Sequence, residues 1–123
     1  MELVNNVHDR RWIDDDTPNA RGYKYIEIVP DHSEYTSAFS CELIHLGPGD
    51  ESLTHVEDYN HLLYVVEGSG EITIGEQTWP LRPGSYAKVM AGDHHSLRNL
   101  GDTEMLILTV YDPPRVRDHG GGR

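Results

Sequence analysis

Short runs of alternating apolar and polar residues, separated by turn-forming residues, extend along most of the chain. These runs are rich in β-branched and aromatic side chains, which suit a pleated, half-buried surface. Glycine, proline and asparagine between the runs supply the backbone conformations that tight turns need, as in Gly47-Pro48-Gly49-Asp50. The runs predict strands at residues 23–29, 36–46, 61–67, 71–74, 78–81, 85–90, 95–99 and 104–111.

The spacing of these runs indicates the fold class. Turn signals recur roughly every eight to twelve residues, which is typical of an all-β sandwich or barrel. No segment of the sequence repeats apolar residues about every 3.6 positions over three turns, so the pattern predicts no long helix. We therefore expect an all-β, antiparallel fold, either a closed barrel or a two-sheet jelly roll.

The two ends of the chain differ from this pattern. Residues 1–22 are polar and irregular, and we interpret them as an arm that wraps the domain or reaches a partner subunit. Residues 115–123 end in Gly120-Gly121-Gly122 and predict a flexible tail. A chain of 123 residues is long enough for one domain with its own core, which we place at residues 23–114.

The amino-acid composition limits the classes of partner that this protein is expected to bind. The chain has 10 Lys and Arg residues against 21 Asp and Glu residues, a formal charge of −11. This charge argues against binding nucleic acid or an anionic membrane through a broad positive field. The N-terminus lacks the apolar run of a signal peptide, and no apolar segment is long enough to span a bilayer. With Cys41 as the single cysteine, we expect a soluble, cytoplasmic protein without an internal disulfide.

Four side chains that can bind a metal stand near predicted strand ends. His55 and Glu57 are two residues apart, so on an extended strand both side chains point to the same face. His61 opens the next predicted strand, and His95 opens another strand after a glycine turn. Three imidazoles and one carboxylate in one cavity suit a borderline divalent ion such as Fe²⁺, Mn²⁺, Zn²⁺ or Ni²⁺. Without a cation, the carboxylate would be desolvated at a high free-energy cost or would become protonated.

The same residues fit the two cupin motifs. Residues 49–68 resemble the first motif, whose glycine and ligand positions are occupied by Gly49, His55, Glu57, His61 and Gly68. Residues 75–99 resemble the second motif, whose glycine, Pro-Gly, histidine and asparagine positions are occupied by Gly75, Pro83-Gly84, His95 and Asn99. The resemblance implies a cupin-type double-stranded β-helix, a jelly-roll barrel, with one divalent metal at His55, Glu57, His61 and His95.

The chain departs from the usual first motif at two positions. A typical cupin has histidine at position 57 and glutamate at position 61, and here the two residue types are exchanged. The set still contains three histidines and one acid, but its arrangement around a metal is permuted. Two alternatives remain open. In one, Glu57 is an acid or base beside a metal held by three histidines, and in the other the chain is a cupin that binds no metal.

Other residues compete for these roles. His94 is the alternative to His95, but it is one residue out of phase and is expected to face the opposite way. His45 is interpreted as an ordinary strand residue that borders the cavity only if Cys41 also faces inward. We interpret Cys41 as a small buried hydrophobe. Tyr59, between two candidate ligands, is either a proton donor over the opening or a structural aromatic at its rim.

Strand parity predicts which side chains line the cavity. Tyr64, Tyr86 and Lys88 are expected to point away from the metal, and Asn99 is expected to brace its strand and turn. Small and apolar walls suit a small, partly hydrophobic substrate that chelates through oxygen. The side chains expected to face inward are Leu63, Val65, Ile72, Ile74, Ala87, Val89 and Leu97.

The resemblance does not select one reaction. Cupins include dioxygenases, isomerases, epimerases, lyases, polyketide cyclases and decarboxylases, and a shared fold does not choose among them. The candidate ligands favour a metal-dependent enzyme on a small organic molecule, with the metal as Lewis acid or dioxygen activator. Glu57 and Tyr59 are its candidate catalytic groups. The alternatives are a non-catalytic cupin that senses or stores a small ligand or metal, and a cupin whose metal only stabilises the barrel. The polar arm and exposed strand edges predict a homodimer.

Overall fold

Strands dominate the structure, as the alternating pattern predicts. The computed structural model describes residues 1–15 and 20–117, without the side chains of residues 20–21 and 53–55. A short 3-10 helix, η1 (Val7–Asp9), precedes the first strand. The strands are β1 (Ile13–Asp14), β2 (Ala20–Arg21), β3 (Lys24–Val29), β4 (Ser40–Leu46), β5 (Glu51–His55), β6 (Asn60–Glu67), β7 (Gly70–Ile74), β8 (Gln77–Leu81), β9 (Tyr86–Val89), β10 (His95–Asn99) and β11 (Met105–Asp112).

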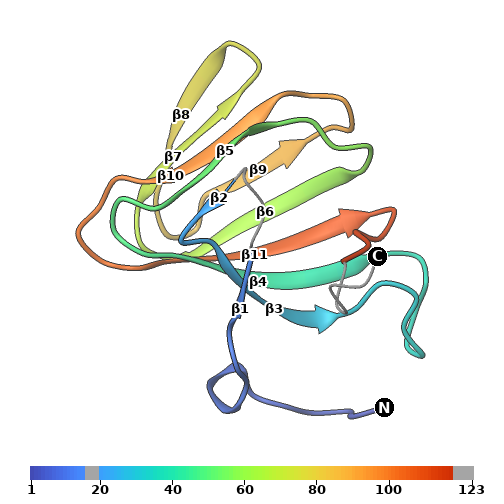
Figure 1. Ribbon diagram of the computed structural model, residues 1–123. Coiled ribbons are helices and arrows are strands. Elements are labelled where there is room, and N and C mark those ends of the chain that lie inside the picture. The colour runs from blue at the N-terminus through green and yellow to red at the C-terminus, as the bar shows by residue number, and fades with distance from the viewer. Residues whose placement is uncertain (16–19, 118–123) are drawn as a thin grey trace.

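The strands form two antiparallel sheets that lie face to face (Figure 1). One sheet has the order β1-β3-β4-β11-β6-β9, and the other has the order β2-β5-β10-β7-β8. Strands distant in sequence are neighbours in both sheets, since β11 lies between β4 and β6 and β10 lies between β5 and β7. Two packed antiparallel sheets with such crossovers form a jelly roll. The all-β, jelly-roll prediction is confirmed.

Alternation along the strands fills the space between the sheets. On β6, every second side chain from His61 to Val65 is buried, and the intervening side chains are exposed. The inward side chains of β11 alternate in the same way and end in Thr109 and Tyr111. Tyr111 pairs with His61 across the two strands, so polar inward side chains gather at one end of the barrel. The apolar core consists of Tyr23, Tyr25, Ile44, Leu46, Leu63, Val65, Ile72, Leu81, Val89, Leu97, Met105 and Ile107.

The predicted strands overlap observed strands, and the main differences lie near the N-terminus, around residue 51 and at the start of β4, which begins at Ser40 and not at residue 36. The sequence pattern gave no strand at residues 51–55, where β5 pairs with β10. Within the predicted arm, β1 pairs with β3 and β2 pairs with β5, so the arm is partly built into the sheets.

The C-terminal segment also differs from the prediction. Arg115 and Arg117 belong to the predicted tail, yet their side chains are mostly buried, with exposed fractions of 17% and 7%. Arg117 is packed against the barrel because it pairs with Glu42 and Asp15, and Arg115 is held by hydrogen bonds to Ser40 and Tyr111, so a flexible tail is wrong for these two residues. The rest of the predicted tail, residues 118–123, lies outside the described residues.

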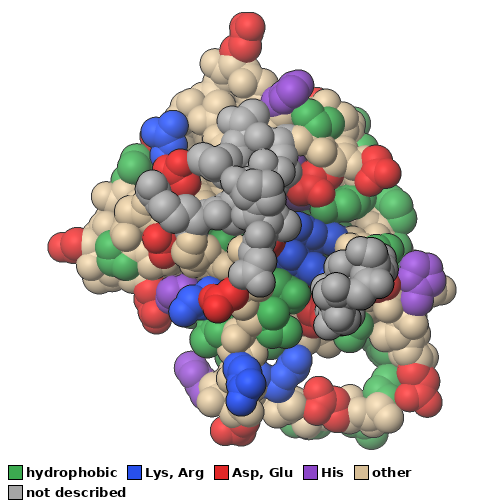
Figure 2. Space-filling model, in the orientation of Figure 1, with side chains coloured by type: hydrophobic (Ala, Val, Ile, Leu, Met, Phe, Trp, Pro, Cys, Tyr) green, Lys and Arg blue, Asp and Glu red, His purple; other side chains and the backbone are tan. Residues whose placement is uncertain are grey.

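The surface agrees with the composition. In the view of Figure 2, acidic side chains are scattered over the visible face and do not form one patch. Among the described residues, no helix has the length and apolar character needed to cross a membrane.

Candidate metal centre

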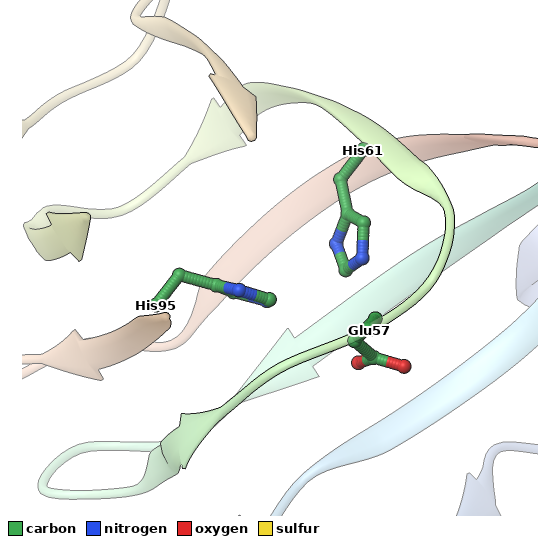
Figure 3. A group of neighbouring side chains, drawn as sticks. All are labelled: Glu57, His61 and His95. Carbon is green, nitrogen blue, oxygen red and sulfur yellow. The ribbon is translucent and has the colours of Figure 1, made fainter. Parts of the chain in front are cut away.

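Three predicted ligands meet at the polar end of the barrel. Glu57 follows β5, His61 lies near the start of β6, and His95 begins β10. One potential ligand atom from each of the three lies within 4.8 Å of the other two. Figure 3 shows the imidazoles of His61 and His95 directed toward one space, with Glu57 beside them on a third segment of the chain. His61 and His95 are 6% and 4% exposed, and their ring centroids are 4.7 Å apart.

The backbone around His95 fixes the orientation of its imidazole. His95 Nδ1 lies 3.1 Å from the carbonyl oxygen of Asp93. A carbonyl only accepts hydrogen bonds, so Nδ1 carries the proton and Nε2 of the neutral ring carries the lone pair. Metal-binding histidines commonly have this arrangement, which holds the ring and raises its basicity. His94, the alternative ligand, is exposed, as strand parity predicted.

Glu57 reaches the site differently from the expectation. The shared-face prediction assumed an extended strand through residue 57, but β5 ends at His55. Glu57 instead lies in the following loop, where its carbonyl accepts a hydrogen bond of 2.8 Å from the backbone N–H of Gly92. This bond ties the Glu57 loop to the turn before β10, so two segments distant in sequence are positioned together.

Tyr59 is buried beside His61 and does not belong to the described lining of the cavity. Its ring is buried and stacks on His61, with centroids 4.9 Å apart and planes inclined by 18°. Its hydroxyl donates a hydrogen bond to Glu57. Burial, together with the hydrogen bond and charge of Glu57, raises the pKa of Tyr59 well above its usual value, so the phenol stays protonated at neutral pH. This geometry supports a positioning role for Tyr59, and proton donation to a substrate stays a prediction.

His55 is placed by its backbone alone. It is the last residue of β5 and pairs with His95 of β10. Its side chain lies outside the described part of the structure. The strand pairing therefore brings residue 55 beside one of the three clustered residues, and its role as a fourth ligand stays a prediction.

A cavity of about 240 Å³ opens onto the candidate ligands. Glu57, His61 and His95 form one part of its wall, and Leu63 and Leu97 contribute apolar surface as predicted. The other five predicted wall residues do not belong to the described lining of this cavity: Val65, Ile72 and Val89 are buried in the core, and Ile74 and Ala87 are partly buried against it. The volume lies just below the roughly 300–1,000 Å³ typical of pockets for drug-sized ligands, so it suits a small molecule.

Several predictions about neighbouring residues are confirmed. His45 pairs with Glu104 at 3.0 Å and is not part of the described cavity wall. Tyr64 and Tyr86 are exposed on the outer face. Burial raises the pKa of the Cys41 thiol to about 11, so it stays protonated at neutral pH and is not an activated nucleophile. Asn99 is buried and donates to the carbonyls of Leu46 and Thr103, which braces the end of its strand.

A charged network beside the cavity was not foreseen. Arg117 forms two hydrogen bonds of 2.7 Å with the carboxylate of Glu42 and one of 3.0 Å with Asp15. Arg115 lies next to it and lines the cavity, as does Asp15. One signal for this network was present in the sequence, because Glu42 shares strand parity with the inward-facing Ile44. A carboxylate on a buried face requires a cation nearby.

The sequence of the barrel matches a known protein family. Residues 42–111 match the model of the cupin domain. The match includes Glu57, His61 and His95 and covers more than half of the chain. The chain belongs to the cupin family. Within this family, two curated relatives and one solved structure are informative.

This cupin is 39% identical over 75 residues to an L-ectoine synthase from Aliivibrio fischeri (strain MJ11), a match covering 55% of this chain and 59% of the relative. It is 31% identical over 72 residues to a 5-nitrosalicylic acid 1,2-dioxygenase from Bradyrhizobium sp, covering 58% of this chain and 34% of that protein. The chain thus spans little more than half the length of the first relative and about a third of the second. The polyketide cyclase from Streptomyces resistomycificus shares the fold, with a TM-score of 0.80, 19% identity and coverage of 91% of this chain and 80% of the cyclase.

Proposed function

We propose that this cupin is a metal-dependent enzyme that acts on a small organic molecule able to chelate the metal through oxygen. The observation that supports this most strongly is the grouping of Glu57, His61 and His95 within 4.8 Å at the wall of a small cavity. The donor set fits a divalent transition metal, because it combines imidazole nitrogens with one charge-balancing carboxylate. The relatives named as a synthase and a dioxygenase are consistent with an enzyme of this family.

The residues have distinct parts in this proposal. Glu57, His61 and His95, with His55 as the predicted fourth ligand, hold the metal. When bound, a divalent metal supplies Lewis-acid polarisation of a substrate oxygen or a place for dioxygen. Tyr59 holds the Glu57 carboxylate through its hydroxyl. Leu63 and Leu97 give the cavity apolar wall that suits the hydrophobic part of a substrate.

Exchangeable water on the metal distinguishes this proposal from a purely structural metal. An enzyme keeps an open coordination position, whereas a structural site is closed by protein ligands. We therefore expect the Mn²⁺-loaded protein to enhance the relaxation of water protons well beyond free Mn²⁺, as measured by NMR relaxation. Mn²⁺ that binds tightly without such enhancement would contradict the proposed enzyme and support a stabilising metal.

Replacement of Glu57 tests whether its carboxylate is a ligand. We expect Glu57→Gln to lower the affinity for Mn²⁺ or Zn²⁺ by about tenfold or more, because a neutral amide offsets none of the metal's charge. Asp58→Asn is the matched control, since Asp58 is an exposed carboxylate in the same loop. Calorimetric titration of both variants gives the comparison. Equal metal affinity in Glu57→Gln and wild type would exclude Glu57 from the ligand set.

The homodimer predicted from the sequence remains a proposal. Strand β9 is an edge of the six-stranded sheet, and the outer faces of β6 and β9 expose Leu62, Tyr64, Val66 and Tyr86. A second copy would cover such an apolar surface. We expect light scattering to give the mass of a dimer at micromolar concentration. A monomer mass at all concentrations up to the millimolar range would refute the dimer.

A further inference from the structure

A second polar group shares the cavity with the candidate metal ligands. It consists of Thr109 and Tyr111 on the inner face of β11, and Arg115 in the segment that follows. The centroid of the Tyr111 ring lies 4.9 Å from the centroid of the His61 imidazole. The same Tyr111 centroid lies 5.5 Å from the guanidinium carbon of Arg115. The Tyr111 ring therefore lies between the candidate metal site and a mostly buried cation. The group is placed to contact the part of a substrate that lies away from the metal.

Arg115 is held in the cavity wall by weak side-chain contacts. Its backbone N–H donates to the hydroxyl of Ser40 at 2.8 Å, which fixes the chain at this point. Its guanidinium donates to the hydroxyl of Tyr111 at 3.3 Å and lies 3.8 Å from the carboxylate of Asp15. The second distance is too long for a hydrogen bond. A guanidinium has five N–H donors, so these contacts leave Arg115 able to bind a further anion.

The neighbouring carboxylates are engaged by Arg117. Glu42 accepts both of its short hydrogen bonds from Arg117, and Asp15 accepts one from the same guanidinium at 3.0 Å. Arg117 itself lies 3.8 Å from the centroid of Tyr25 and is enclosed by the barrel. Arg117 therefore has a structural role, and Arg115 is the cation that faces the cavity.

Thr109 gives independent evidence of a ligand. Its side chain is completely buried and lines the cavity. Among the described residues, its hydroxyl has no hydrogen-bond partner. A buried hydroxyl without a partner is unfavourable and rare in native proteins, and a functional role or a bound water or ion is among the reasons that such a group is kept. Thr109 and Tyr111 are two residues apart on one strand, so both side chains face the cavity.

The charges around the cavity favour an anion. Arg115 and Arg117 together balance Glu42 and Asp15. A divalent ion held by Glu57, His61 and His95 would leave one positive charge that the carboxylate of Glu57 does not balance. In a small cavity next to buried charges, a substrate with one negative charge would compensate this excess.

We propose that Arg115, assisted by the hydroxyl of Thr109, binds a carboxylate of the substrate. The substrate class is then a small monocarboxylate with a second oxygen group that reaches the metal, such as a hydroxy acid. This assignment rests on the proposed function for the metal-directed oxygen, but the carboxylate site is defined by residues outside the candidate ligand set.

Matched acids and amides test the site without an assay of turnover. The probes are 3-hydroxypropionate, 4-hydroxybutyrate and 5-hydroxyvalerate, each compared with its neutral amide, and binding to the purified protein is measured by calorimetry or ligand-observed NMR. We expect wild type to prefer at least one acid over its amide. Arg115→Met is expected to lower the affinity for that acid by roughly tenfold or more and to leave amide binding almost unchanged, because a charge-assisted hydrogen bond is lost.

Two variants separate this effect from misfolding or a general loss of positive charge. Thr109→Val keeps the side-chain shape, and we expect it to retain thermal stability while weakening acid binding about fivefold or more. Arg98→Met removes an exposed arginine that pairs with Glu71, and we expect it to bind the acid like wild type. The proposal is overturned if wild type shows no preference for acids or if Arg115→Met retains the preference. Wild-type acid affinity in Thr109→Val would overturn the part assigned to Thr109.

Metal content of the same samples keeps the two proposals distinguishable. An acid preference that depends on Arg115 in protein that binds no transition metal would support the carboxylate site and contradict the proposed metal-dependent function. Bound metal with no such dependence would contradict the carboxylate site alone.

Discussion

Replacing His95 with alanine is expected to reduce the transition-metal content of the purified protein to about a tenth of wild type or less. Loss of a residue that only supports a metal ligand typically lowers metal affinity by about 10- to 100-fold, and loss of the ligand itself should lower it at least as much. His95 is buried, begins β10, and carries its proton on Nδ1 toward the carbonyl of Asp93. Its Nε2 is therefore the nitrogen that would bind a metal. Elemental analysis by plasma mass spectrometry gives the number of metal ions per chain.

The neighbouring histidine supplies a close control. His94 is exposed and does not belong to the group of three candidate ligands, so His94→Ala is expected to keep the wild-type metal content. We expect His61→Ala to lose metal as His95→Ala does, because both imidazoles belong to the group within 4.8 Å. Equal metal content in His94→Ala and His95→Ala would remove the assignment of His95 as a ligand.

Replacing Arg117 with alanine is expected to destabilise the fold by about 3–5 kcal/mol, the usual effect of removing one partner of a buried ion pair. The carboxylate of Glu42 is 1% exposed and receives two short hydrogen bonds from Arg117. Without the guanidinium of Arg117, the negative charge of Glu42 stays buried among core side chains and lacks a positively charged partner. Urea unfolding at neutral pH measures the change in the free energy of unfolding.

Two further variants show whether the effect comes from the buried charge. The pair between Arg98 and Glu71 is more exposed, so Arg98→Ala is expected to cost less than about 1 kcal/mol. The double variant Glu42→Leu with Arg117→Met is expected to be more stable than Arg117→Ala, because it removes both charges of the pair. An Arg117→Ala protein as stable as wild type would show that Glu42 is not held by this pair.

Much of the fold follows from local pattern. The alternation of β6 and β11 predicted which of their side chains face inward, and the period of two leaves few other arrangements once one face is buried. The same parity placed Tyr64 and His94 outside. The pattern failed for β5, because its polar residues 51–55 gave no apolar alternation. Strand β5 is specified by its pairing with β10, and a local sequence pattern does not show which strands pair.

The candidate site was predicted in part. Motif spacing predicted that Glu57, His61 and His95 lie close together, because the lengths of turns and the alternation of strands determine where the side chains at strand ends are placed. The backbone conformation at Glu57 was predicted wrongly. The assumed extended strand is replaced by a loop, which is held by a hydrogen bond from the Gly92 N–H to the Glu57 carbonyl. The cavity side that carries Arg115 was missed, because a Pro-rich segment near a glycine-rich end resembles a flexible tail.

By itself, the sequence determined the all-β class, the inward faces of the strands and the grouping of candidate ligands, because these depend on periodicity and on short connections. Only the tertiary structure decided which cation neutralises Glu42 and that Arg115 joins the cavity wall. Glu42 and Arg117 are 75 residues apart in the chain, and no local pattern links them. A buried carboxylate requires a counter-charge, but the partner that supplies it is fixed by the route of the folded chain.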